Sequence, residues 1–351
     1  MKRILLTGCG SPAAQNFLSC LRMAPEEFYI VGCDMNKYHL EWGELNAAYE
    51  SPAGGTEEYL DFINALVKKE KIDFLHGQSD LDAAFFATKG KALKVPTFYP
   101  PTETIQLAQN KMRMVRRWHD LGIRQDKPMV IHSELILRKL LDRGGLPLWL
   151  RATKGAGARG SCRIDSVEQG VAWLSYWRAR EVDWEFMLEA YFPGREFAFS
   201  SLWYKGELVC SSERERLEFI FPQHAPSGVT SSPVVARTVH NEAVNDMATQ
   251  AILALDAKPH GIFSVDLKED REDIPRPTEI NAGRFFTTSR FLAEGGCNMP
   301  YLFVKAGLKE EMEIETTPYN SIPAGLYWLR HIDCMTKLVE EGKWRGAILK
   351  V

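Results

Sequence analysis

The first third of the chain alternates short apolar segments with amphipathic ones, and this alternation constrains the fold more than any other feature. Residues 2–24 read as a strand, a tight glycine turn and an amphipathic helix, and a second strand over 28–34 ends at Asp34. A helix over 57–69 and a strand over 72–76 follow. Strands that alternate with helices of this length form βαβ units around a parallel sheet, so we expect a Rossmann-like domain.

The glycine turn after the first strand matches a dinucleotide-binding fingerprint. Residues 8–13, GCGSPA, fit G-x-G-x-x-A, and Asp34 follows where an acidic residue holds a ribose hydroxyl. One hypothesis is therefore an NAD(P)-dependent oxidoreductase that uses Gly8, Gly10 and Asp34. The other is a turn whose glycines only let the helix pack close to the strand, since Pro12 removes one N–H that would face a pyrophosphate.

The composition is that of an ordinary globular protein. The 351 residues suffice for two or three domains, and a net charge of −3 gives no reason to expect nucleic acid or an anionic membrane as partner. No stretch approaches the ~18 apolar residues of a membrane span. The seven cysteines are scattered without a C-x-x-C pair, so we expect no disulfide framework or zinc site, and a cytoplasmic location.

A second glycine loop lies in the middle of the chain, in LWLRATKGAGARGS (148–161). It has the glycine spacing of a P-loop but lacks the lysine after the last glycine, and the next helix begins only near Ser166, so the loop joins two strands as a hairpin. Its amides can lie over a triphosphate. An exposed surface hairpin is the alternative, but a charge that follows an apolar strand, as Arg151 does, usually has a specific partner. Further positive charge comes from Lys154 and Arg159.

Two later segments carry hard oxygen ligands. Residues 261–286 read as a strand with Asp266, a polar turn, and a strand with Glu279 and Asn281. Period two puts Glu279 and Asn281 on one face, and an antiparallel neighbour can bring Asp266 beside them. Two carboxylates and an amide oxygen suit Mg²⁺ shared with phosphates. A solvated hairpin with ordinary acidic residues is the alternative, and the apolar neighbours argue against it.

Together these segments resemble the ATP-grasp superfamily, in particular its carbamoyl-phosphate-synthetase-like branch. The motifs, in the family's order, are NKMRMVRRWHDLGI (110–123), LWLRATKGAGARGS (148–161), LEAYFPGREF (188–197), GIFSVDLKED (261–270) and EINAGRFFTTSR (279–290). The resemblance covers nearly the whole chain and implies a mixed α/β and α+β fold. It implies a Rossmann-like pre-ATP-grasp domain over 1–109, a small subdomain with the glycine flap over 110–182, and a large subdomain with the metal site over 183–351.

The resemblance also implies roles for individual residues. Phosphate contacts would come from Lys111 and Arg151, where Arg151 stands in place of the lysine of many members. The flap would span 155–160, the backbone of 189–192 would read adenine, and Glu196 would hold the ribose. The implied nucleotide-binding set is Lys111, Arg151, Lys154, Gly155, Gly157, Arg159, Gly160, Glu189, Ala190, Tyr191, Phe192 and Glu196.

The implied metal ligands are Asp266, Glu279 and Asn281, for Mg²⁺ with Mn²⁺ as an alternative ion. The implied catalytic residues are Arg284, Arg151 and Arg290. Arg284 matches an arginine that holds the acyl phosphate, but in EINAGR it comes one residue later than in the common EINPR. Arg290 is expected to face the substrate.

The activity that the resemblance implies is an ATP- and Mg²⁺-dependent ligase that joins a carboxylate to an amine through an acyl phosphate, releasing ADP and phosphate. Phosphorylation supplies a better leaving group than hydroxide, and its catalysis is mostly positioning and charge neutralisation. The expected partners are a small-molecule carboxylate and amine, without nucleic acid or membrane, in a monomer or a homodimer. The alternatives are the oxidoreductase above and a grasp-fold protein that binds nucleotide without ligase chemistry.

Residues 213–239 mix charges with Pro, Gly, Ser and Thr and show little periodicity. We predict a long loop near the site, with Arg214, Arg216 and His224 as candidate contacts for the acceptor. An exposed irregular loop is the alternative.

Overall fold

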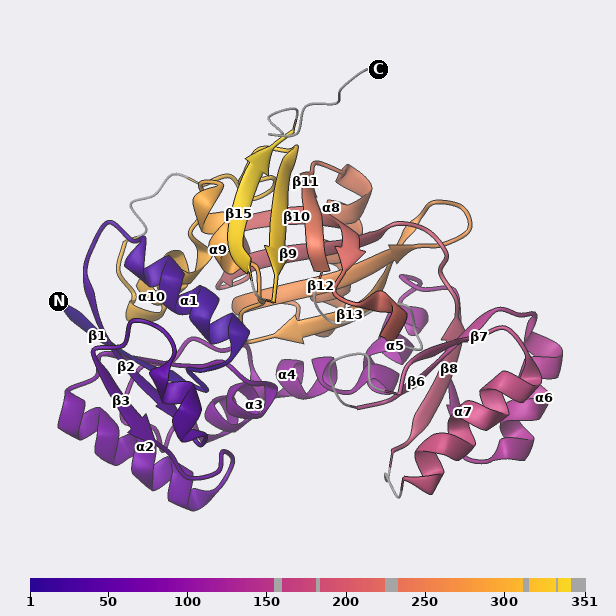
Figure 1. Cartoon of the computed structure of the whole chain (residues 1–351), viewed down its shortest axis with the longest axis horizontal. Coiled ribbons are helices and arrows are strands. Elements are labelled where there is room, and N and C mark those ends of the chain that lie inside the picture. The colour runs from indigo at the N-terminus through magenta and orange to yellow at the C-terminus, as the bar shows by residue number, and fades with distance from the viewer. Residues whose placement is uncertain (155–159, 181–183, 225–232, 312–315, 333, 342–351) are drawn as a thin grey trace.

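The computed structural model describes residues 1–154, 160–180, 184–224, 233–311, 316–332 and 334–341. Figure 1 shows a parallel-sheet part at the N-terminus, a large sheet at the centre and a small sheet at the opposite side of the molecule. Helices α4 (Thr102–Ala108) and α5 (Lys111–Asp120) run between these parts. Arg113, Arg116 and Arg117 of α5 are exposed, while Trp118 is buried and its Nε1 donates to Ala251 O at 3.1 Å.

The N-terminal part is a four-stranded parallel sheet in the order β3-β2-β1-β4, which confirms the predicted Rossmann-like arrangement. Leu5 packs into the core on one face, and Ile4 and Leu6 pack into the core on the other. The helix predicted over 57–69 ends one residue later, at Glu70. Its elements are β1 (Lys2–Thr7), α1 (Pro12–Arg22), β2 (Phe28–Asp34), η1 (Lys37–Glu41), β3 (Ala47–Glu50), α2 (Glu57–Glu70), β4 (Phe74–Gly77) and α3 (Asp80–Lys89).

The small sheet has the order β5-β8-β6-β7 and its own apolar core. Strands β6 and β7 are antiparallel, so the central glycine loop joins two strands as predicted. Ser166 caps the following helix by accepting the N–H of Gln169 at 3.1 Å. The elements are β5 (Met129–Ile131), α6 (Glu134–Gly144), β6 (Leu148–Ala152), β7 (Cys162–Ile164), α7 (Val167–Ala179) and β8 (Phe186–Ala190).

The large sheet has the order β13-β12-β9-β10-β11-β14-β15, and all its strand pairs are antiparallel. Helix α8 covers β13, β12 and β9, while α10 contacts β9 and also α1 and β4 of the first sheet. The elements are β9 (Glu196–Tyr204), β10 (Glu207–Phe219), η2 (Pro222–His224), β11 (Pro233–Val239), α8 (Glu242–Leu255), β12 (Gly261–Glu269), β13 (Pro275–Ala282), α9 (Ser289–Glu294), α10 (Met299–Leu308), β14 (Leu326–His331) and β15 (Cys334–Glu340).

The prediction of a long loop over 213–239 is wrong. Strand β10 continues to Phe219 and β11 begins at Pro233, so only the intervening segment connects them, and part of that segment lies outside the described residues. The charges that hide the strand pattern have partners on other strands: Glu215 pairs with Arg237 at 2.8 Å and Arg216 with Asp266 at 2.6 Å. His224 lies in η2, beyond the end of β10.

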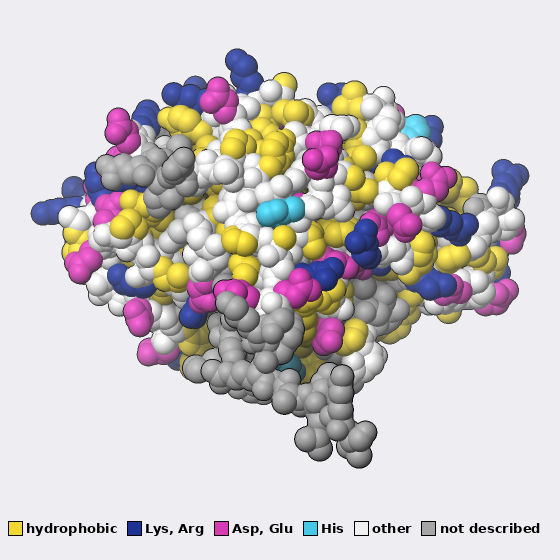
Figure 2. All heavy atoms as spheres, turned by 90° about the horizontal axis from the view of Figure 1, so that it is seen from above, with side chains coloured by type: hydrophobic (Ala, Val, Ile, Leu, Met, Phe, Trp, Pro, Cys, Tyr) yellow, Lys and Arg dark blue, Asp and Glu magenta, His cyan; other side chains and the backbone are white. Residues whose placement is uncertain are grey.

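The surface carries both signs of charge. In the view of Figure 2, Lys and Arg side chains are interspersed with Asp and Glu rather than gathered into one patch. None of the helices in the described ranges has the length and apolar character needed to cross a membrane. The cysteines that the structure describes as free, Cys9, Cys20, Cys33, Cys162, Cys210 and Cys297, are all buried.

Candidate active site

The β12–β13 hairpin brings the predicted metal ligands together. Asp266 and Glu279 are partners across the antiparallel pair, and Asn281 follows Glu279 on the same face. The Asp266 and Glu279 side chains are 24% and 31% exposed, so their carboxylate oxygens are accessible at this edge of the large sheet. Among the described residues no cluster of three His, Cys, Asp or Glu could hold a metal, so a site here would need the Asn281 amide oxygen. This oxygen-only set fits a hard cation such as Mg²⁺.

The root of the glycine hairpin lies beside these acids. Lys111 begins α5, its Nζ lies 3.3 Å from Glu279 Oε1, and its N–H donates to Thr153 O at 3.1 Å. Arg151 Nη2 donates to Thr278 O at 3.0 Å, in the residue before Glu279. The small sheet and the acidic hairpin are therefore joined at the point where the glycine loop leaves β6.

Arg284 reaches the same place through a glycine turn. Its Nη2 donates to Asn281 Oδ1 at 2.6 Å, and its guanidinium also pairs with Asp80 at the start of α3. Gly283, the extra residue of EINAGR, has φ +83° and donates its N–H to Ile262 O at 2.9 Å. The left-handed turn thus returns Arg284 to the acidic hairpin despite its shifted position in the sequence.

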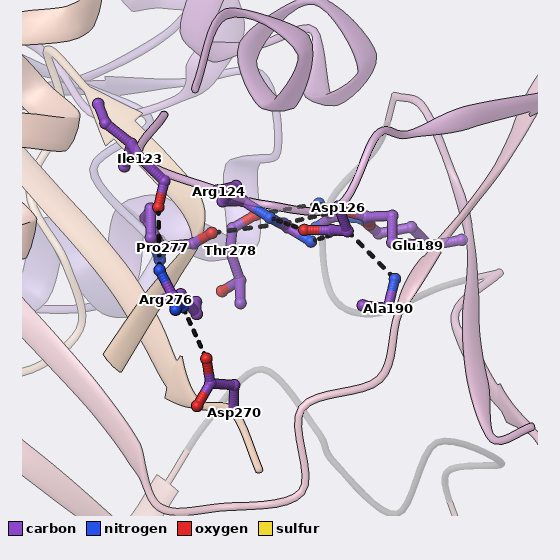
Figure 3. A network of polar contacts seen from close by, with 10 residues as sticks. Ile123, Arg124, Asp126, Glu189, Ala190, Asp270, Arg276, Pro277 and Thr278 are labelled. Atoms are coloured by element: carbon purple, nitrogen blue, oxygen red, sulfur yellow. Dashed lines mark hydrogen bonds and ion pairs between the residues drawn. The ribbon is translucent and has the colours of Figure 1, made fainter. Parts of the chain in front are cut away.

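Arg151 has a specific buried partner, as its position after an apolar strand predicts. Its guanidinium forms an ion pair with Glu189 on β8, and the two residues are 5% and 3% exposed. Figure 3 shows that Arg124 Nη1 reaches the same carboxylate, at 2.9 Å, and pairs through Nη2 with Asp126 at 2.5 Å. Asp126 in turn accepts the N–H of Ala190 at 3.2 Å. A buried network therefore fixes the end of β8, where the resemblance places adenine recognition.

Sequence reasoning missed Arg124 and Asp126. Arg124 is 2% exposed, and its carboxylate partner on β8 is 65 residues away along the chain. A buried arginine in a short connecting segment gives no periodic signal. The only clue was a cation and an anion two residues apart, which is common on protein surfaces.

The other residues of the predicted nucleotide set lie around this network. Glu196 Oε1 accepts from Lys268 Nζ at 2.6 Å, and Lys268 lies 5.7 Å from the centre of the Tyr191 ring. The Phe192 ring lies 4.8 Å from the guanidinium carbon of Arg124. Lys268 is a further cation that the sequence did not single out.

Some predicted residues lie elsewhere or outside the described ranges. Arg290 pairs with Glu294 at 2.8 Å, its backbone N–H donates to Asn16 of α1, and it lines a surface pocket with Gln15 and Arg22, so it lies beside α1 rather than at the acidic hairpin. Lys154 is exposed, and Gly160 has φ +77° and packs against Trp184. The flap residues Gly155, Gly157 and Arg159 are outside the described residues.

The N-terminal glycine turn is filled by the protein's own side chains. Gly10 donates its N–H to Asp34 at 3.3 Å, and a Cβ added at Gly10 would lie 2.1 Å from His39 Cβ. Near Gly8, the Asp82 carboxylate accepts from Thr7 at 3.0 Å, and burial raises its pKa. Close packing explains Gly10 and the left-handed φ of +57° explains Gly8, and a buried carboxylate disfavours a pyrophosphate at this turn.

Comparison with known proteins shows the fold but no sequence relative. No protein-family model and no curated protein matches the chain. An L-amino acid ligase from Bacillus licheniformis superposes with a TM-score of 0.68 at 16% identity, over 93% of this chain and 79% of that one. An N5-carboxyaminoimidazole synthase from Aspergillus clavatus, in complex with ADP and 5-aminoimidazole ribonucleotide, gives 0.70 at 15% identity, over 93% and 81%. A biotin carboxylase from Campylobacter jejuni gives 0.66 at 16%, over 93% and 74%.

These neighbours are all ATP-grasp enzymes of the carboxylate–amine ligase type. Their likeness extends over the parallel sheet, the small sheet and the large sheet alike, because each alignment covers 93% of the chain. The chain therefore has the ATP-grasp fold.

Proposed function

We propose that the chain is an ATP- and Mg²⁺-dependent ligase that joins a carboxylate to an amine through an acyl phosphate. The observation that carries this proposal is the position of Asp266 and Glu279, opposite each other and beside Lys111 at the root of the glycine hairpin. Similar proteins were crystallised with MgADP or ADP, which supports the same nucleotide here. The domain limits proposed are 1–109, 110–182 and 183–351.

The reaction would proceed in two steps. A carboxylate oxygen attacks the γ-phosphorus of ATP, and the P–O bond to ADP breaks, leaving an acyl phosphate. The amine nitrogen then attacks the acyl carbon, the C–O bond to phosphate breaks, and the nitrogen loses a proton. Mg²⁺ bound by Asp266, Glu279 and Asn281 would neutralise phosphate charge in the first step.

The chain's own cations would serve the phosphates. Lys111 lies beside Glu279, so its ammonium group would neutralise charge next to the metal. Arg284, held by Asn281 and Asp80, would bind the acyl phosphate. Arg151 would have two roles. Its ion pair with Glu189 would hold β8 in position for the nucleotide, and its remaining charge would attract the phosphates.

A matched pair of variants tests the proposal. Glu279→Gln removes one metal-binding charge, whereas Glu272→Gln removes an exposed charge in the turn of the same hairpin. With a mixture of small carboxylates and amines as substrate pool, wild-type protein and Glu272→Gln should release ADP, and Glu279→Gln should not while remaining folded. Equal ADP release by all three proteins would reject the assignment.

Two measurements separate this proposal from the alternatives, a nucleotide-binding protein without ligase chemistry and an NAD(P)-dependent oxidoreductase. Phosphate release that rises with added carboxylate would exclude a protein that only binds nucleotide. Tryptophan fluorescence should respond to MgATP and not to NADH, because the turn at Gly8 and Gly10 is packed against Asp34, Asp82 and His39.

A homodimer in a reducing, cytoplasmic setting is also proposed. One neighbour, a biotin carboxylase domain from Hydrogenobacter thermophilus, is described as a dimer. The buried free thiols of this chain suit a reducing compartment. Light scattering at micromolar concentration would test the oligomeric state directly.

A further inference from the structure

Three arginines gather on the face of the large sheet that carries Asp266. Arg214 and Arg216 are two residues apart on β10, and Arg330 lies on β14. Arg216 Nη2 donates to Asp266 Oδ1 at 2.6 Å, so the group borders the proposed metal site. We call Arg214, Arg216 and Arg330 the arginine cluster.

Small residues on the strands in between make room for these long side chains. Ala198 on β9 is the register partner of both Arg214 and Asp266. Ala236 on β11 is the partner of both Arg216 and Trp328. Register partners point to the same face, so the short side chains of Ala198 and Ala236 leave room there for the long arginine side chains.

No carboxylate among the described residues forms an ion pair with Arg214. Arg214 is 3% exposed, and its guanidinium carbon lies 5.5 Å from the centre of the Phe286 ring and 5.1 Å from that of Trp328. Its Nη1 donates to Ser200 Oγ at 3.2 Å. Burial, together with Arg216 and Arg330, lowers the Arg214 pKa to about 9. A buried cation with like-charged neighbours is costly unless an anion accompanies it.

The unsatisfied side-chain nitrogen atoms of this region are hydrogen-bond donors. Within the described ranges, the buried atoms without a partner include Arg214 Nε, Arg216 Nε, Arg330 Nη2, Trp328 Nε1 and Thr288 Oγ1. Arg330 already donates through Nη1 to Thr287 O at 2.7 Å and through Nε to Pro233 O at 2.8 Å, so its orientation is fixed. Fixed donors that lack acceptors are suited to an anionic ligand.

We propose that the arginine cluster binds a carboxylate or phosphate group of the acceptor substrate, which is therefore an anion. This inference rests on the proposed function, because it places the acceptor beside the acyl phosphate formed at Asp266 and Glu279. Phe286 lies two residues after Arg284, so the residue proposed to bind the acyl phosphate and the ring beside Arg214 belong to one segment.

Paired probes test this assignment in the presence of saturating MgADP. Succinate should raise the thermal unfolding midpoint of the wild-type protein, and neutral succinamide should not. Glycerol 3-phosphate and neutral glycerol form the second pair. The pair with the larger difference in unfolding midpoint shows whether the cluster prefers a carboxylate or a phosphate. Equal effects of the charged and the neutral member in both pairs would overturn the proposal.

Two variants show whether the cluster causes the response. Arg214→Met keeps most of the apolar volume without the charge, and it should weaken anion binding at least tenfold without lowering the unfolding midpoint of the free protein. Arg237→Met is the matched control, because Arg237 pairs with Glu215 on the opposite face of the sheet. A full anion response in Arg214→Met would overturn the proposal, and Arg330→Met repeats the test if that protein does not fold.

The response of the unfolding midpoint to MgADP distinguishes failure of this inference from failure of the proposed function. A midpoint that does not respond to MgADP would reject the ATP-dependent ligase itself. A normal MgADP response combined with no anion response would reject the arginine cluster alone.

Discussion

Arg151 and Glu189 form a buried ion pair between neighbouring strands of the small sheet, and Arg124 shares the same carboxylate. One carboxylate therefore neutralises two guanidiniums, while Asp126 supplies the second negative charge. The pair connects β6, which leads into the glycine hairpin, with the segment proposed to read adenine, of which Glu189 is the first residue. It links the stability of the small sheet to the geometry of the nucleotide site.

Glu189→Gln should destabilise the protein strongly. The substitution keeps the shape but leaves Arg124 and Arg151 in a buried position with less negative charge, a loss on the order of 3–5 kcal/mol. Urea denaturation measures the free energy of unfolding. Glu185→Gln, an exposed site just before β8, is the control and should change stability by less than about 0.5 kcal/mol. Equal stabilities of the two variants would show that the network contributes nothing.

Gly283→Ala should damage the site through the backbone. Gly283 has φ +83°, and an added Cβ would lie 3.3 Å from Tyr99 and from Ile105. An alanine there costs about 1–2 kcal/mol for the left-handed backbone alone, and relief of the contacts would move Arg284. We expect lower stability and at least a tenfold loss of ADP formation.

Gly122→Ala is the matched control for that substitution. Gly122 has φ +73°, but a Cβ there would meet nothing within 4 Å. Its backbone cost should be similar and its ADP formation normal. If both variants keep full activity, the turn at Gly283 does not position Arg284.

Glu213→Gln should change how stability depends on pH. Burial raises the pKa of Glu213 to about 8, whereas the carboxyl group titrates near 4.5 in the unfolded chain. Between these values the unfolded chain binds fewer protons, so the wild-type protein loses stability as pH rises, and the loss is complete above the folded pKa. The variant lacks this titrating carboxyl group, so its stability relative to wild type should rise by on the order of 4 kcal/mol between pH 5 and pH 9.

Unfolding free energies at several pH values measure this effect. Glu218→Gln, an exposed position on the same strand, should follow the wild-type profile. A constant difference between Glu213→Gln and wild type across the range would contradict the raised pKa.

The sequence predicted those features that depend on local periodicity. Alternating strands and helices indicated the parallel sheet, and residues two apart on a strand indicated that Glu279 and Asn281 share a face with Asp266. The start of a helix near Ser166 was predicted because the signal is local, and Ser166 is its cap in the structure. A fold built from alternating strands and helices can therefore be predicted from the periodicity of a single sequence.

Features that depend on distant partners were not predictable. The part of β10 from Glu213 onward was predicted as a loop because its charged side chains have distant partners: Arg216 pairs with Asp266, 50 positions away. The Arg124 network has the same origin. The role of Arg284 stayed open because EINAGR has one residue more than the common EINPR. The left-handed backbone at Gly283, which the sequence alone does not reveal, compensates for the extra residue.

Calorimetric titration with MgATP tests the central claim most directly. The account predicts that wild-type protein and Glu272→Gln bind MgATP with similar affinity, that EDTA weakens this binding, and that Glu279→Gln binds at least tenfold more weakly and responds less to EDTA. If Glu279→Gln binds MgATP as tightly as wild type with the same dependence on the metal, the acidic hairpin is not the metal site and the account is contradicted.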